Sequence, residues 1–94
     1  MRLPATSARR RRPLITVYTR RRCGLCAQAE TVVARAARGR ADVELVDVDA
    51  SELLTQRYTL RVPVVAVDGR EVAEYQVDPR VLRTALRAAR RRTP

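Results

Sequence analysis

The chain contains two cysteines, and both lie in one tetrapeptide, Cys23-Gly24-Leu25-Cys26. An apolar run, Leu14 to Tyr18, comes just before it, and apolar residues recur at helical spacing just after it. The pattern therefore predicts a strand over residues 14–18 and a helix from about residue 24 to 37. The two thiols then lie at the first turn of that helix, where partial positive charge and free N–H groups favour a thiolate over a thiol.

Residues 39–58 predict a second strand and a short second helix. Gly39 is expected to end the first helix. Apolar and acidic residues then alternate over 43–48, which is typical of a half-buried strand. The stretch 49–52 fits a capping box, with Asp49 as the N-cap and Glu52 reaching back to it. A short helix is expected to follow, as far as about Tyr58.

The last third of the chain predicts a hairpin and a helix. A valine-rich third strand covers 64–67, Asp68-Gly69 is a strong signal for a two-residue turn, and a fourth strand covers 71–75. Asp78 before Pro79 is typical of an N-cap and the first residue of a final helix. The order β-α-β-α-β-β-α begins with a βαβ unit, whose two strands should be parallel. The pattern therefore predicts an α/β fold with a four-stranded mixed sheet flanked by helices.

The two cysteines are the only residues with an obvious chemical role, and the composition limits what that role is. The 94 residues are enough for one small domain, and no apolar stretch approaches the roughly 18 residues that span a membrane. No signal peptide is visible, so we expect a cytoplasmic protein, where paired cysteines are redox-active or metal-binding rather than structural. Zinc needs four ligands, and the chain offers no His and no third Cys. We therefore expect no metal site, unless a second copy or external thiols complete an iron–sulfur cluster.

Positive charge is concentrated at the two ends of the chain. The formal net charge is +10, and every cationic side chain is Arg. Residues 1–12 carry five Arg and residues 80–94 carry six, with no acid in either segment. We expect residues 1–13 to be a disordered basic tail and residues 14–92 to be the folded domain. Basic ends attract polyanions, but no recognition motif or aromatic stacking platform is visible, so nucleic acid is not an expected partner.

The element order, the cysteine pair after the first strand and Val62-Pro63 at the head of the third strand together resemble the thioredoxin fold. The element lengths resemble its glutaredoxin branch, over about residues 14–91. Residues 17–26 are similar to the strand-to-dithiol turn of glutaredoxin-like proteins, and residues 61–65 to their cis-proline loop. The chain departs from that pattern at Gly24-Leu25, where glutaredoxins have Pro-Tyr, and at Arg61, where they have Thr. It also has Tyr-Gln-Val over 75–77, where glutaredoxins have a Gly-Gly pair that helps to hold glutathione.

The resemblance implies a role for each residue of the site. Cys23 is the exposed nucleophile, and Cys26 is the resolving thiol that attacks a mixed disulfide on Cys23. Pro63 is expected to be cis and to face the dithiol, which would leave the backbone of Val62 free to pair with a substrate like an added strand. We expect Arg22 and Arg61 to contact substrate. Arg61 either meets a substrate carboxylate or points to solvent.

The predicted function is that of a thiol–disulfide oxidoreductase which reduces protein disulfides or glutathione-type mixed disulfides. Glutathione is a candidate co-substrate, a reductase is a candidate partner, no cofactor is expected, and the protein is expected to be a monomer. The arginines near Cys23 predict a preference for acidic partners. The alternative is a binding module whose dithiol is vestigial or a switch, and which docks nucleic acid or acidic partners through its Arg-rich ends. Two side chains keep two interpretations each: Tyr18 lines the groove or fills the core, and Asp78 binds an amine or caps the last helix.

Overall fold

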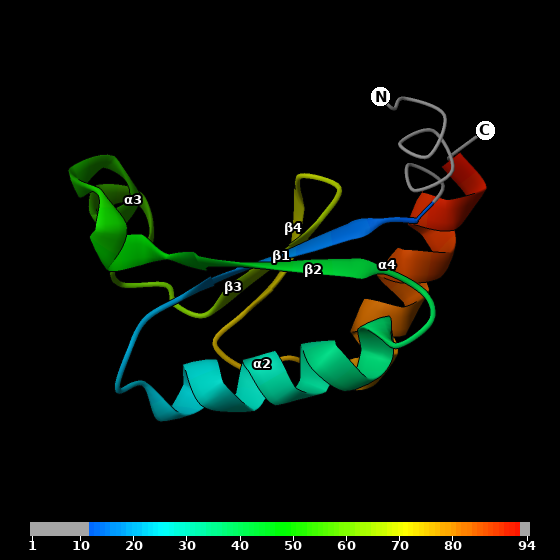
Figure 1. Cartoon of the computed structure of the whole chain (residues 1–94), viewed down its shortest axis with the longest axis horizontal. Coiled ribbons are helices and arrows are strands. Elements are labelled where there is room, and N and C mark those ends of the chain that lie inside the picture. Colours follow the sequence, from blue (N-terminus) through cyan, green and yellow to red (C-terminus); the bar gives the residue numbers. More distant parts are fainter. Residues whose placement is uncertain (1–11, 93–94) are drawn as a thin grey trace, which may run out of the picture.

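The computed structural model describes residues 12–92. This part of the chain forms a single sheet with helices on both faces (Figure 1). The elements are β1 Leu14–Thr19, α2 Gly24–Ala37, β2 Asp42–Asp47, the 3-10 helix η1 Val48–Ala50, α3 Glu52–Tyr58, β3 Val64–Val67, β4 Arg70–Glu74 and α4 Pro79–Arg92. The predicted element order is confirmed, with one 3-10 turn added between β2 and α3.

The sheet has the strand order β2-β1-β3-β4. β1 pairs in parallel with β2 and antiparallel with β3, and β4 pairs antiparallel with β3. The register sets Tyr18 opposite Val64, so the chain leaves β1 at the same end of the sheet at which it enters β3. The segment before β3 and the turn that leads to Cys23 therefore meet at one end of the sheet. The predicted thioredoxin-like α/β fold is confirmed.

Two apolar clusters cover the two faces of the sheet. The larger cluster packs α2 and α4 against one face, and its buried residues include Ile15, Val17, Val33, Val65, Val67, Leu82 and Leu86. The smaller cluster, on the other face, joins α3 to the sheet through Val48, Tyr58 and Val64. Side chains alternate across a strand, so neighbours such as Val64 and Val65 contribute to different clusters. This division fixes α2, and with it the cysteines, against one face of the sheet.

The turns follow the chemistry of their residues. Asp68 and Gly69 have φ of +49° and +85°, which is the left-handed pair that a two-residue hairpin turn requires. The Asp68 carboxylate also accepts a hydrogen bond from the backbone N–H of Leu14 at 2.9 Å. Asp78 accepts one from the N–H of Arg80 at 2.8 Å, which makes it the predicted cap of α4. That bond lowers the pKa of the Asp78 carboxyl.

The predicted start of α3 is wrong by two residues. The N-cap is Ser51, whose hydroxyl accepts a hydrogen bond from the N–H of Leu54 at 3.1 Å. β2 ends at Asp47, which caps η1 by accepting from the N–H of Asp49 at 2.9 Å. Asp49 itself is bound by Arg20, so its carboxylate is not available for the capping box.

The folded domain includes two residues that the sequence places in the basic tail. Pro13 is buried, and its carbonyl accepts a hydrogen bond from the N–H of Asp42 at 3.0 Å. Arg12 donates to the carbonyl of Ala41 at 3.2 Å. The rest of the predicted tail, residues 1–11, lies outside the described residues. Within residues 12–92, no helix is both long and apolar enough to cross a membrane.

Candidate functional site

The two cysteines lie at the N-terminus of α2 and are joined by a disulfide, with their Cα atoms 5.2 Å apart. Cys23 is the N-cap of the helix, and its Sγ accepts a hydrogen bond from the backbone N–H of Cys26 at 3.1 Å. Cys26 is fully buried, whereas Cys23 is partly exposed. Arg22, just before the cap, has a φ of +56°, so the chain turns sharply from β1 into α2 at a residue that is not glycine. This arrangement presents one sulfur to solvent and places the other behind it.

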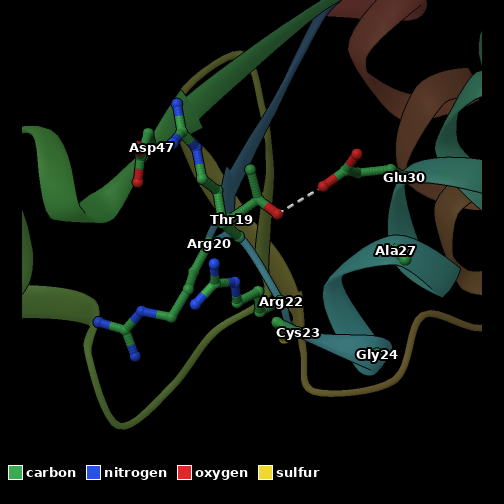
Figure 2. A pocket seen from close by; sticks show the side chains of 9 residues that line it. Thr19, Arg20, Arg22, Cys23, Gly24, Ala27, Glu30 and Asp47 are labelled. Atoms are coloured by element: carbon green, nitrogen blue, oxygen red, sulfur yellow. Dashed lines mark hydrogen bonds between the residues drawn. The ribbon is translucent and has the colours of Figure 1, made fainter.

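An open cavity of about 680 Å³ lies beside Cys23 (Figure 2). It is lined by Thr19, Arg20, Arg21, Arg22, Cys23, Gly24, Ala27, Glu30 and Asp47. Cys23, Ala27 and Glu30 are spaced by four and three residues, so they share one face of α2. The Thr19 hydroxyl donates to Glu30 at 2.6 Å across the cavity, which ties β1 to the second turn of the helix (Figure 2). The walls therefore carry charges of both signs.

Arg20 is directed away from the cysteines, toward η1 and α3. Its guanidinium donates to both carboxylate oxygens of Asp49, at 2.9 and 2.8 Å, and to the hydroxyl of Thr59 at 2.7 Å. This contact lowers the pKa of Asp49. Arg21 and Arg22 are exposed. Of the three arginines that precede Cys23 in the sequence, Arg20 thus holds the turn in place, and Arg21 and Arg22 are the two whose charges remain at the rim of the cavity.

Arg61 has two carboxylate partners on the hairpin. It forms ion pairs with Glu71 and, at 3.0 Å, with Glu74, and its guanidinium lies 5.7 Å from the centroid of the Tyr58 ring. The hydrogen bond that Arg61 donates to Glu71, followed by the one it donates to Glu74, raises the pKa of Arg61. A substrate carboxylate would have to displace one of these glutamates, so the predicted contact between Arg61 and substrate stays a prediction.

The peptide bond between Val62 and Pro63 is cis, as predicted. Pro63 is buried, and its carbonyl accepts a hydrogen bond from the N–H of Tyr75 at 2.9 Å. The register of β1 and β3 puts this loop beside the turn that leads to Cys23. No hydrogen bond engages the backbone of Val62 within residues 12–92. Its N–H and C=O are therefore available for a partner.

A second, smaller groove of about 220 Å³ lies on the other side of the dithiol turn. Its walls carry no charged side chain and consist of Leu25, Gln28, Ala29, Val32, Tyr75, Gln76 and Val77. Tyr75 is about half-exposed, has a φ of +66°, and its hydroxyl donates to the carbonyl of Leu60 at 2.9 Å. Tyr75 lies across the cis-proline loop, because its backbone N–H donates a hydrogen bond to Pro63 and its hydroxyl donates one to Leu60. The sequence places Tyr75 at the end of a strand and does not mark it as a site residue.

Comparison with known proteins identifies the family. Residues 14–87 match the sequence profile described as "Glutaredoxin-like domain (DUF836)". The chain belongs to this glutaredoxin-like family. No curated protein matches the sequence significantly.

Several solved structures are similar to this chain. The glutaredoxin-like chain is similar to a structural genomics target protein from X. campestris, with 39% identity and a TM-score of 0.66 over 79% of this chain and 96% of that one. It is also similar to a mutant thioredoxin from Halobacterium salinarum, with 27% identity and a TM-score of 0.63 over 90% of this chain and 79% of that one. The thioredoxin Deadhead from Drosophila melanogaster has 29% identity and a TM-score of 0.55 over 92% and 88% of the two chains.

One open interpretation is decided by packing in the glutaredoxin-like domain. Tyr18 stacks on Tyr58, with ring centroids 4.2 Å apart and an angle of 16° between the planes. Burial, followed by the hydrogen bond with Tyr58, raises the pKa of Tyr18. Tyr18 belongs to the cluster beneath α3, whereas the groove beside the cysteines is formed by Tyr75.

Proposed function

We propose that this glutaredoxin-like domain is a thiol–disulfide oxidoreductase that reduces protein disulfides through Cys23. The observation that carries the proposal is the difference between the two sulfurs. Cys23 is partly exposed and caps α2, whereas Cys26 is buried one helical turn behind it. A helix N-terminus stabilises a thiolate at the cap, and a buried thiol within bonding distance is placed to resolve a mixed disulfide.

The reaction needs no group beyond the dithiol and its substrate. The Cys23 thiolate attacks one sulfur of the substrate disulfide, a Cys23–substrate disulfide forms, and the other substrate sulfur leaves as a thiolate and takes a proton. Cys26 then loses its proton and attacks the Cys23 sulfur. The second substrate thiol is released, and the Cys23–Cys26 disulfide remains. Two electrons have passed to the substrate, and an external thiol donor, either glutathione or a reductase, must return two electrons to the domain.

The charge around Cys23 supports thiolate formation in this proposal. Arg21 and Arg22 line the cavity beside the sulfur, and neither has an ion-pair partner within the described residues. A cation within a few ångströms favours the thiolate, and salt screens part of this effect because both side chains are exposed. Of the two arginines predicted to contact substrate, Arg22 keeps that role in this proposal, because Arg61 is paired with Glu71 and Glu74.

The neutral groove favours a protein substrate over free glutathione. An extended peptide can pair with the free backbone of Val62, while the side chain next to its cysteine enters the groove between Leu25 and Tyr75. Glutathione is a charged tripeptide, and this groove offers it no charged partner. Mixed disulfides with glutathione stay the second substrate class, bound from the side of Arg21 and Arg22.

The proposal is tested by titrating the dithiol of the full chain against a graded thiol/disulfide buffer, with mass spectrometry as the readout. We expect reversible loss of two hydrogens as the Cys23–Cys26 disulfide forms. Cys26→Ser should trap a mixed disulfide on Cys23, and the matched variant Cys23→Ser should trap none. If the thiols never pair, or if both variants trap substrate equally, the proposed function is wrong.

A further inference from the structure

Two basic segments of the chain come together at one end of the molecule, and the acidic residues Asp42 and Asp78 directly adjoin them in the sequence. Residues 31–41 and 79–92 contain no Asp or Glu, and they hold Arg35, Arg38, Arg40, Arg80, Arg83, Arg87, Arg90, Arg91 and Arg92. The two segments are neighbours in space, because the end of α2 packs against α4 in the larger apolar cluster (Figure 1). The folded chain therefore joins two basic segments that are about forty residues apart in the sequence.

Four of these arginines surround a shared cavity of about 220 Å³. Its lining consists of Leu86 and the four residues that we call the arginine cluster: Arg40, Arg83, Arg87 and Arg90. The three on α4 are spaced by four and three residues, so they follow one face of the helix over about 10 Å. Arg40 reaches the cavity from the α2–β2 connection.

Within the described residues the arginine cluster forms no ion pair, and the pKa of Asp78 is lowered mainly by its hydrogen bonds from Arg80 and less by the charge of Arg83. Arg12, Arg20, Arg61 and Arg80 each have a carboxylate partner. Within residues 12–92, no member of the cluster has a carboxylate within ion-pair distance, and Arg40 donates only to the carbonyl of Ala36, at 3.5 Å. All four side chains are exposed. Four like charges around one cavity repel one another, and an anion bound between them would remove that repulsion.

We propose that the arginine cluster binds the phosphate backbone of a double-helical nucleic acid. Guanidinium groups bind phosphate oxygens in pairs, and a row of them along a helix face matches a row of phosphates. The proposal is independent of the proposed function, since the cluster contains no thiol and lies at the end of α2 remote from Cys23. It requires no recognition motif, because phosphate contacts carry no sequence information.

The surroundings of the cluster favour a duplex over other polyanions. No aromatic residue occurs in 31–41 or 79–92, so unpaired bases of a single strand would find no stacking platform there. The apolar face of α4, with Leu82 and Leu86, is buried in the core and cannot enter a bilayer. A duplex needs neither feature, because it presents its phosphates on the outside and keeps its bases paired.

The test is fluorescence anisotropy of a short random-sequence DNA duplex titrated with the full chain over a series of salt concentrations. Two double variants remove the same charge: Arg83→Gln with Arg87→Gln in the cluster, and Arg57→Gln with Arg70→Gln outside it. We expect the cluster variant to weaken binding about tenfold and to lower the slope of log K against log salt by about two. The control variant should leave the slope unchanged.

Three results would overturn the proposal. The first is no binding of the duplex at roughly 0.15 M salt. The second is an equal loss in both double variants, which would show that net charge alone acts. The third is binding to phosphatidylserine vesicles, but not to the duplex, with the same dependence on Arg83 and Arg87. Circular dichroism of both variants verifies that the fold is retained.

Discussion

Reduction of the Cys23–Cys26 disulfide is expected to lower the free energy of unfolding of the domain by about 1–2 kcal/mol. The disulfide links residues three apart in sequence, and chain entropy gives roughly 2 kcal/mol for so small a loop at 25 °C. The reduced protein recovers part of this loss. The Cys23 sulfur accepts the N–H of Cys26 at 3.1 Å, and a thiolate at that cap gains roughly 0.3–1 kcal/mol from the helix N-terminus.

Urea denaturation followed by circular dichroism, with and without a phosphine reductant, measures this difference. The thiolate stabilises the reduced protein only when the thiol is ionised. The free energy of unfolding of the oxidised protein should therefore exceed that of the reduced protein by more in mildly acidic buffer than in mildly basic buffer. A double variant with Cys23→Ser and Cys26→Ser should not respond to the reductant. A reduced form as stable as the oxidised form in acid would refute the loop-entropy argument. A difference that is independent of pH would refute thiolate capping.

Three further predictions test the N-cap of α3, the neutral groove at Tyr75 and the dependence of stability on Asp78 at low pH. Ser51→Ala should lower the free energy of unfolding by about 1 kcal/mol, measured by urea denaturation, because α3 loses its N-cap bond; no change would mean that another residue caps the helix. Tyr75→Gly keeps the positive φ but removes a groove wall. It should reduce kcat/KM by about tenfold for a peptide disulfide with Leu beside the cysteine and much less for one with Ser there; equal losses would argue against the groove. Asp78 has a pKa below its ordinary value, so its stabilising contribution is present above the unfolded-state pKa and is lost as pH falls through the folded-state pKa. In Asp78→Asn the free energy of unfolding, measured by urea denaturation, should therefore fall less as the pH is lowered. An unchanged dependence on pH in acid would contradict this assignment.

The elements could be predicted because their signals are local. The helical spacing after Cys23, the valines of β3 and the Asp68-Gly69 turn each identify an element from adjacent residues, and their predicted bounds agree with the structure to within about a residue. The start of α3 could not be predicted in this way, because Asp49 and Ser51 are both good caps. The choice depends on Arg20, a residue 29 positions before Asp49, which occupies the Asp49 carboxylate.

The residues of the candidate site also fall into a group that the sequence predicts and a group that it does not. The cysteine pair and the cis-proline loop follow from short motifs, whereas the partners of their neighbours depend on the folded hairpin. Arg61 meets Glu71 and Glu74 only because β4 returns beside the loop, so the sequence predicts a substrate carboxylate or solvent as its surroundings and does not predict this pairing. The place of Tyr75 in the groove cannot be predicted from the sequence, because it depends on a left-handed φ that non-glycine residues rarely adopt. In both cases the information lies in contacts between elements.

The two proposed sites lie at opposite ends of α2, and this separation makes their tests independent. The helix has 14 residues, which gives about 21 Å between Cys23 and the connection that carries Arg40 (Figure 1). The Debye length at physiological salt is about 8 Å, so the charges of the arginine cluster are screened at the thiol. Arg83→Gln with Arg87→Gln should therefore leave the rate of Cys23 alkylation by iodoacetamide unchanged, whereas Arg22→Gln, next to the sulfur, should slow it. A thiol that responded to the distant pair as strongly as to Arg22 would mean that the two ends of α2 are coupled through the fold and not through the charge near each site.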